Sequence, residues 1–188
     1  MASRPQNTDF YFRRGVTWTD VGSKGFSARF NPGGFVFDVS GSGAFPDKPE
    51  EIPLILGVLN SSVNSFLLNI LNPTIHFQVG DLTRLPIPQA LSDRLSYSTT
   101  LAIFAQYAIL IVDESTYDFI APPRWDTGLA DLAAAEARLA ALEAQIDDEV
   151  YRLYGISDAD RAAIEAELAG KSLANDDEDM ESALSNTD

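Results

Sequence analysis

The stretch of residues 71–88, LNPTIHFQVGDLTRLPIP, constrains the fold more than any other part of the chain. Its Asn72-Pro73 pair predicts the end of a helix, because proline disfavours the helical conformation for the residue before it and cannot extend the hydrogen-bond ladder. Apolar and polar residues then alternate over residues 74–79, which is typical of a half-buried strand. Gly80-Asp81 predicts a turn after this strand. We therefore expect a helix and a strand that meet at Asn72-Pro73.

Two long apolar segments flank this stretch and predict the core helices. Apolar residues recur at helical spacing over residues 54–71, and a helix without any charged residue is expected to be buried on nearly all sides. Residues 92–112 predict a second helix, although residues 109–112 fit a strand equally well. The residues expected to face inward from this second helix are Leu95, Ile103, Phe104, Tyr107 and Ile111. Phe66 and Phe77 are expected to be buried where the first helix meets the strand.

The N-terminal part of the chain predicts short strands separated by turns. It is rich in aromatic residues, valine and threonine, which favour strands, and in glycines, which favour turns. Three or four short strands are expected, from the runs at residues 10–12, 16–19, 26–30 and 35–39. Residues 41–51 are expected to form a loop.

The C-terminal part predicts helices and an acidic tail. Residues 131–154 are rich in alanine and carry a narrow apolar seam of the coiled-coil type. The residues of this seam are Leu132, Leu139, Leu142, Ile146, Val150 and Leu153. Gly155 predicts the end of this helix, and Ser157 with Asp160 resembles a capping box that begins a short helix to Leu168. Residues 170–188 are acidic and poor in large apolar side chains, so we expect them to be disordered.

Charge is distributed unevenly along the chain. The formal net charge is −15, but seven basic and seven acidic residues precede position 91, so the whole imbalance lies in the second half. The chain has no cysteine and one histidine, which excludes disulfides, thiolate metal sites and histidine-rich metal sites. No apolar run reaches the roughly 18 residues of a membrane-spanning helix, so we expect a cytoplasmic protein.

These patterns together predict an α+β protein with four parts. Residues 1–9 are expected to be disordered, and residues 10–112 to form a lobe in which a glycine- and aromatic-rich β region packs with helices. Residues 113–169 are expected to form an aromatic linker and a helical, coiled-coil-like spacer. Residues 170–188 form the acidic tail.

Several phrases of the sequence resemble one family of enzymes. The pattern LNPTxxFQVGDLxxLPI, preceded by GxLNS, and the phrases GVTW, SARF and GFVFDV resemble the C-terminal target-recognition region of PglX-type adenine-specific DNA methyltransferases of BREX phage-defence systems. The phrase VYRLYGISDADRAAIE is similar to the end of type IIG restriction-modification recognition regions. The resemblance spans about residues 10–168. It implies that the intact enzyme transfers a methyl group from S-adenosylmethionine to adenine N6, and that BREX components are partners.

Two further phrases mimic the catalytic motifs of a methyltransferase. Residues 38–43, DVSGSG, look like a glycine-rich cofactor turn, and Asn72-Pro73-Thr74-Ile75 looks like the Asn-Pro-Pro-aromatic motif that holds a flipped adenine. The second phrase lacks both the second proline and the aromatic ring, and one helix separates the two phrases instead of several βα units of about 30 residues. We therefore assign no catalytic, cofactor-binding or metal-binding residue, and we interpret His76 as structural.

With no catalytic residue assigned, the function that the sequence still supports is binding of duplex DNA. Cations alternate with aromatic and hydroxyl side chains in the β region, where cations can contact phosphates and loop side chains can reach base edges. The predicted DNA-binding residues are Arg13, Arg14, Thr17, Lys24, Ser27 and Arg29. The chain is thus expected to be a DNA-binding target-recognition fragment that is inactive alone and acts with a catalytic domain or subunit.

A second hypothesis belongs to another class of function. The charge of −15 repels a phosphate backbone, and the apolar seam of residues 131–154 suits association with another protein. The alternative is therefore an acidic protein-interaction module that docks a subunit or mimics DNA.

Overall fold

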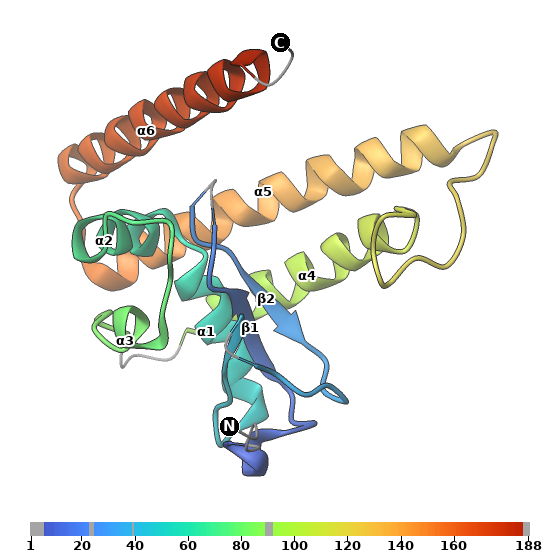
Figure 1. The fold of residues 1–188 in the computed structure, drawn as a ribbon, viewed down its shortest axis with the longest axis horizontal. Coiled ribbons are helices and arrows are strands. Elements are labelled where there is room, and N and C mark those ends of the chain that lie inside the picture. Colours follow the sequence, from blue (N-terminus) through green and yellow to red (C-terminus); the bar gives the residue numbers. More distant parts are fainter. Residues whose placement is uncertain (1–5, 23–24, 39, 89–91, 186–188) are drawn as a thin grey trace.

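The computed structural model describes residues 6–22, 25–38, 40–88 and 92–185, with side chains described as far as residue 171. A small antiparallel sheet packs against helices, which confirms the predicted α+β class (Figure 1). The elements in chain order are the 3-10 helix η1 (Thr8–Phe10), β1 (Gly15–Thr19), β2 (Ala28–Asn31), β3 (Gly41–Ala44), the 3-10 helix η2 (Pro49–Glu51), α1 (Ile52–Leu59), α2 (Ser62–Leu71), α3 (Val79–Leu82), α4 (Asp93–Leu110), α5 (Gly128–Tyr154) and α6 (Asp158–Ser185).

The sheet has the strand order β2-β1-β3, with both pairs antiparallel. Val16 and Trp18 on β1 are buried and point to the helices, while Thr17 between them faces outward. The predicted strands at residues 16–19 and 26–30 are confirmed as β1 and β2. The strands predicted at residues 10–12 and 35–39 are wrong, because residues 10–12 and 35–38 do not join the sheet; residue 39 lies outside the described residues.

The third strand comes from residues that were expected to be a loop. In β3, Gly43 lies opposite Thr17, and a Cβ atom on Gly43 would come 2.9 Å from the ring of Phe45. The glycine therefore leaves room for that ring against the sheet. A glycine-rich segment forms a strand here because it pairs with β1, about 25 residues earlier in the chain, and because the ring of Phe45 packs against it; local propensity does not reveal this pairing.

The apolar segment of residues 54–71 forms two helices instead of the single helix predicted. The helical segments Pro49–Leu59 and Ser62–Leu71 meet at an angle of 69°. At the break, Asn60 accepts a hydrogen bond from the backbone nitrogen of Ala28 (2.8 Å) and donates one to the carbonyl of Ala28 (2.9 Å). The next residue, Ser61, caps α2. Asn60 thus binds the edge of β2 as a neighbouring strand would.

Two apolar clusters form the core, and α1 contributes to both. The sheet-side cluster contains Val16, Trp18, Ala28, Ile52, Leu56, Leu59, Leu68, Phe77 and Leu85. The helix-side cluster contains Leu54, Val58, Val63, Leu95, Ala102, Ala105, Leu142, Ile146, Val150, Tyr151 and Ile164. The packing therefore continues across the boundary that the sequence analysis drew between residues 112 and 113.

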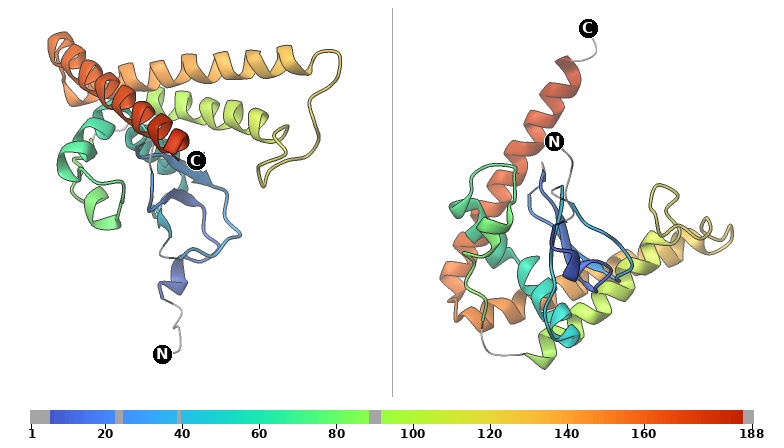
Figure 2. Two further views of the ribbon diagram at one scale, coloured as in Figure 1. Left: turned by 45° about the horizontal axis from the view of Figure 1, so that its top comes forward. Right: turned by 60° about the horizontal axis from the view of Figure 1, so that its bottom comes forward.

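Helices α4 and α5 run antiparallel as the two arms of a hairpin (Figure 2). Helix α4 confirms the helix expected over residues 92–112, and Leu95 is buried as predicted. Phe104 and Tyr107 were expected inside, but 66% and 47% of these side chains are exposed. The small residues Ser98, Ala102 and Ala105 face the core instead.

The small inward residues of α4 allow α1 and α5 to approach closely. A Cβ atom on Gly57 of α1 would lie 2.4 Å from the hydroxyl oxygen of Thr99 on α4. On the α5 side, the buried carboxylate of Glu149 accepts a hydrogen bond from the hydroxyl of Ser92, the residue that caps α4. Arg152 donates two hydrogen bonds to the same carboxylate, at 3.0 and 2.6 Å.

The predicted seam residues of α5 lie on its packed side, where Leu142, Ile146 and Val150 are buried and Leu139 and Leu153 are partly buried. Gly155 ends the helix in the left-handed conformation, with φ of 66°, as its position predicted. Ser157 accepts a hydrogen bond from the backbone nitrogen of Asp160, so the predicted cap is confirmed. The helix that follows extends to Ser185, beyond the end expected at Leu168.

Within the described ranges, no single helix has the length and apolar character to cross a membrane, and the bent pair of Pro49–Leu59 and Ser62–Leu71 meets those criteria only when its two segments are taken together.

Candidate functional site

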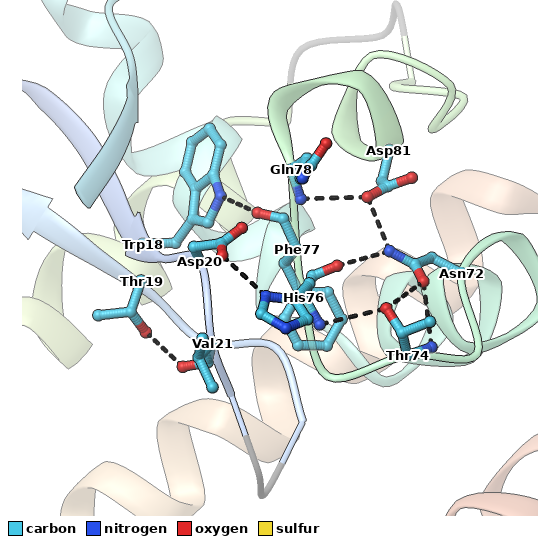
Figure 3. A network of polar contacts seen from close by, with 10 residues as sticks. All are labelled: Trp18, Thr19, Asp20, Val21, Asn72, Thr74, His76, Phe77, Gln78 and Asp81. Atoms are coloured by element: carbon cyan, nitrogen blue, oxygen red, sulfur yellow. Dashed lines mark hydrogen bonds and ion pairs between the residues drawn. The ribbon is translucent and has the colours of Figure 1, made fainter. Parts of the chain in front are cut away.

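Residues 72–81 dock onto the end of β1 and the loop after it (Figure 3). The indole nitrogen of Trp18 donates to the carbonyl of Phe77 at 2.9 Å, and the backbone nitrogen of Phe77 donates to the carbonyl of Asp20 at 2.6 Å. The strand predicted over residues 74–79 is wrong, since a single bridge between Val21 and His76 is all that forms there. Phe77 is buried as predicted, with 3% exposed, whereas Phe66 is only partly buried.

The side chain of Asn72 explains why this segment curls instead of extending. Its amide nitrogen donates to the carbonyl of His76 at 2.5 Å and to the carboxylate of Asp81 at 2.8 Å. Its oxygen accepts from the hydroxyl of Thr74 at 2.7 Å and from the backbone nitrogen of Thr74 at 3.0 Å. These contacts use both donors and both acceptor positions of the amide. Asn72 therefore holds its own loop and has no free donor or acceptor for a target base.

Asp81 fixes the far end of the same loop. Its carboxylate accepts a hydrogen bond from Asn72 and a second one, at 3.1 Å, from the backbone nitrogen of Gln78 at the start of α3. One carboxylate oxygen thus joins the end of α2 to the beginning of α3. The residues that carry the LNPTxxFQVGD resemblance are used for folding this loop and binding it to the sheet.

His76 pairs with Asp20 at the end of β1. The ring nitrogen Nδ1 lies 2.8 Å from a carboxylate oxygen of Asp20, and 55% of the histidine side chain is exposed. The histidine backbone nitrogen also donates to Thr74. The pair adds a further link between the loop and β1. Among the described residues, no group of three or more histidine and acidic side chains could hold a metal ion.

The DVSGSG phrase has a local structure unlike a cofactor turn. The carboxylate of Asp38 accepts hydrogen bonds from the backbone nitrogens of Ser40 at 2.9 Å and Gly41 at 3.2 Å. Gly41 and Gly43 then lie within β3, an edge strand antiparallel to β1. The Asp38 carboxylate therefore caps the backbone where the chain enters the sheet.

Two of the predicted DNA-binding residues lie side by side on the outer face of the sheet. Thr17 and Arg29 are directly opposite each other in the β1–β2 register. Arg29 is exposed, and Thr17 is partly exposed and donates its hydroxyl hydrogen to the carbonyl of Ser42 at 2.9 Å. Ser27 is exposed immediately before β2. The sheet therefore presents a polar strip with a cation at one edge.

The other predicted cations have separate surroundings. The guanidinium of Arg13 donates to the carbonyl of Pro46 at 3.2 Å and lies 5.3 Å from the centre of the Phe10 ring. Phe10 belongs to an aromatic cluster with Phe45 and Phe37. Arg14 is exposed beside Gly33, and Lys24 lies outside the described residues. Sequence reasoning did not find this cluster, because its rings come together only when the sheet forms.

Comparison with known proteins shows what this chain is related to. No family model matches the chain. The adenine-specific methyltransferase BrxX of Escherichia coli O9:H4 (strain HS) is 38% identical over 84 residues, which are 44% of this chain and 7% of that protein. The adenine-specific methyltransferase PglX of Lacticaseibacillus casei (strain Zhang) is 38% identical over 85 residues, 45% of this chain and 7% of the relative. The chain is related to these methyltransferases. It matches only a small fraction of the length of either one.

Proposed function

We propose that this chain is a target-recognition part of an adenine-specific DNA methyltransferase of a BREX-type phage-defence system. The observation that supports this most strongly is the relationship to two proteins, BrxX and PglX, that both bear the name adenine-specific methyltransferase. The exposed Arg29, opposite the partly exposed Thr17 on the outer face of the sheet, supplies a surface that suits nucleic acid.

We assign the methyl-transfer reaction to another part of the enzyme. Asn72, the residue that resembles a catalytic asparagine, is fully hydrogen-bonded within its own loop. S-adenosylmethionine would be held by that other part, which would transfer the methyl group to adenine N6. The chain described here contributes contacts to duplex DNA and acts beside a catalytic domain or subunit.

Contacts to DNA would begin with phosphate. Arg29 supplies a guanidinium for a phosphate oxygen, and Ser27 supplies a hydroxyl next to it, at the same edge of the sheet. Arg13 and Arg14 would add contacts from the segment before β1. The acidic half of the chain repels DNA phosphates at long range. Salt screens this repulsion over roughly 8 Å at physiological ionic strength, so it should slow the approach of DNA without preventing close contact.

The test is a titration of a labelled, adenine-containing duplex at low and moderate salt, with the catalytic part of a BrxX-type enzyme present. Charge reversal by Arg29→Glu should weaken binding and lower the slope of log affinity against log salt by about one per lost phosphate contact. Arg138→Glu, on the exposed side of α5, is the matched control and should change the slope much less. Equal effects of both changes, or no binding of the parent at low salt, would contradict the proposal.

The charge of −15 supports a second candidate, an acidic protein-interaction module. Removal of residues 170–188 separates the two candidates. A recognition module should bind DNA equally well or more tightly without this acidic segment, because long-range repulsion is reduced. An interaction module should lose its protein partner instead.

A further inference from the structure

Helix α4 carries an exposed aromatic stripe on the side that faces away from the core. We define the α4 stripe as Tyr97, Thr100, Phe104 and Tyr107, of which the three aromatic side chains are 67%, 66% and 47% exposed. Their successive spacings of three, four and three residues place them on one side of the helix. The opposite side carries Leu95 and Ala102, which are buried.

The α4 stripe is also free of charge. No charged residue occurs over residues 95–112, on either side of the helix. The neighbouring arm of the hairpin differs, since the exposed surface of α5 carries Glu136, Arg138 and Glu143. A helix face that is exposed to water ordinarily carries charged and polar residues, as α5 does.

Exposed apolar side chains continue into the loop that joins α4 to α5. Tyr117, Ile120 and Trp125 of this loop are 87%, 69% and 104% exposed. The ring of Tyr117 lies 5.8 Å from the ring of Phe35, which links the loop to the segment between β2 and β3. Exposed apolar side chains thus occur on α4 and on the loop that follows it, and large exposed apolar patches are typical of sites that bind another protein.

We propose that the α4 stripe is the surface through which this chain docks onto the catalytic part of the methyltransferase. Aromatic residues are enriched at protein–protein interfaces, where they supply much of the binding energy. A stripe without cations cannot neutralise the charge of a phosphate backbone, so it differs from the strip around Arg29. The matched segment is 7% of BrxX and of PglX, so most of each relative consists of other sequence that such a surface can contact. This inference rests on the proposed function for the identity of the partner.

The test uses a BrxX of Escherichia coli from which the whole region that corresponds to this chain has been removed, coexpressed with this chain so that both parts fold together. Binding of the two purified parts is then measured by calorimetry. Phe104→Glu should weaken association at least about tenfold, because it places a charge in the centre of an apolar interface. The matched control is Ile70→Glu, which changes a 60% exposed apolar residue on α2 and should leave association unchanged.

Three outcomes would overturn the inference. The first is that the parent chain does not associate with the shortened BrxX, and the second is that Phe104→Glu and Ile70→Glu weaken association equally. The third is that sedimentation shows self-association of the chain that Phe104→Glu abolishes, which assigns the stripe to a second copy. Duplex binding is followed in parallel: loss of DNA binding with docking retained would contradict the proposed function alone, and loss of docking with DNA binding retained would contradict this inference alone.

Discussion

The indole nitrogen of Trp18 donates a hydrogen bond of 2.9 Å to the carbonyl oxygen of Phe77, a residue 59 positions away along the chain. Both residues are buried, with 2% and 3% exposed. The phenyl ring of Phe26 lies beside both aromatic rings, 6.2 Å from that of Trp18 and 5.4 Å from that of Phe77. The bond joins the central strand of the sheet to the loop held by Asn72.

Trp18→Phe should destabilise the protein by about 1–3 kcal/mol, because it removes the donor and leaves a buried carbonyl without its partner. Thermal unfolding followed by circular dichroism measures this change. Trp125→Phe is the matched control, since Trp125 is fully exposed and its replacement should shift stability by less than about 0.5 kcal/mol. Equal shifts in the two variants would show that the bond contributes nothing.

Phe77→Ala should lower the free energy of unfolding by about 3–5 kcal/mol, as expected for a large cavity in a packed core. Phe66→Ala should have a smaller effect, because Phe66 is only partly buried. Chemical denaturation of both variants checks the order. If Phe66→Ala is the more damaging change, the loop around Phe77 does not pack as described.

Elements with strong local signals were predictable from the sequence. Residues 16–19 alternate and form β1, Gly155 ends α5 in the left-handed conformation, and Ser157 caps α6. Each of these signals acts within a few residues of the chain. The sequence did not predict which site residues lie together. Arg29 lies opposite Thr17 only because of the register between β1 and β2, and the sequence does not specify that register.

Errors occurred where distant contacts decide the structure. Asn60 looks like one more polar residue in an apolar helix, yet it ends that helix by binding Ala28 on β2. Residues 74–79 alternate, but Ile75 and Val79 are 51% and 50% exposed, and only Phe77 of the apolar set is buried. The periodicity of α4 did not reveal which side faces the core, because its small residues pack inward and Phe104 lies outside.

The loop held by Asn72 permits a test by exchange of two residues. Asn72→Asp replaces a donor with a carboxylate next to Asp81 and should destabilise the protein by about 1–3 kcal/mol. Asp81→Asn in the same chain restores a donor and an acceptor and should recover part of this loss. A double-mutant cycle by urea denaturation measures the coupling. Additive effects of the two changes would contradict direct contact between them.

The same residue gives a prediction about activity. The chain alone, incubated with labelled S-adenosylmethionine and an adenine-containing duplex, should incorporate no methyl group, because Asn72 is engaged within its own loop. A BrxX-type enzyme is the positive control. Methyl transfer by the isolated chain that Asn72→Ala abolishes would overturn the assignment of chemistry to another part of the enzyme.

Acid should weaken the connection between α4 and α5 through Glu149. Hydrogen bonds from Arg152 lower the pKa of Glu149 from 4.5 to about 2, with a further contribution from Ser92, although burial opposes the shift. Because the folded-state pKa is the lower one, the stabilisation is present above about pH 4.5 and is lost as the pH falls towards 2. Glu149→Gln should therefore be less stable than the parent at pH 7, by about 1–3 kcal/mol for the charge-assisted hydrogen bonds that weaken.

The difference between Glu149→Gln and the parent should shrink between pH 5 and pH 3, because Glu149 binds a proton in the unfolded chain, where its pKa is the ordinary 4.5, at a higher pH than in the folded protein. Urea midpoints at about pH 7, 5 and 3 measure this convergence, over the range in which a lowered carboxyl pKa acts on stability. Glu136→Gln, at an exposed position on the same helix, is the control and should follow the parent at every pH. A difference between Glu149→Gln and the parent that stays constant over this range would mean that the ion pair with Arg152 does not contribute to the stability of the hairpin.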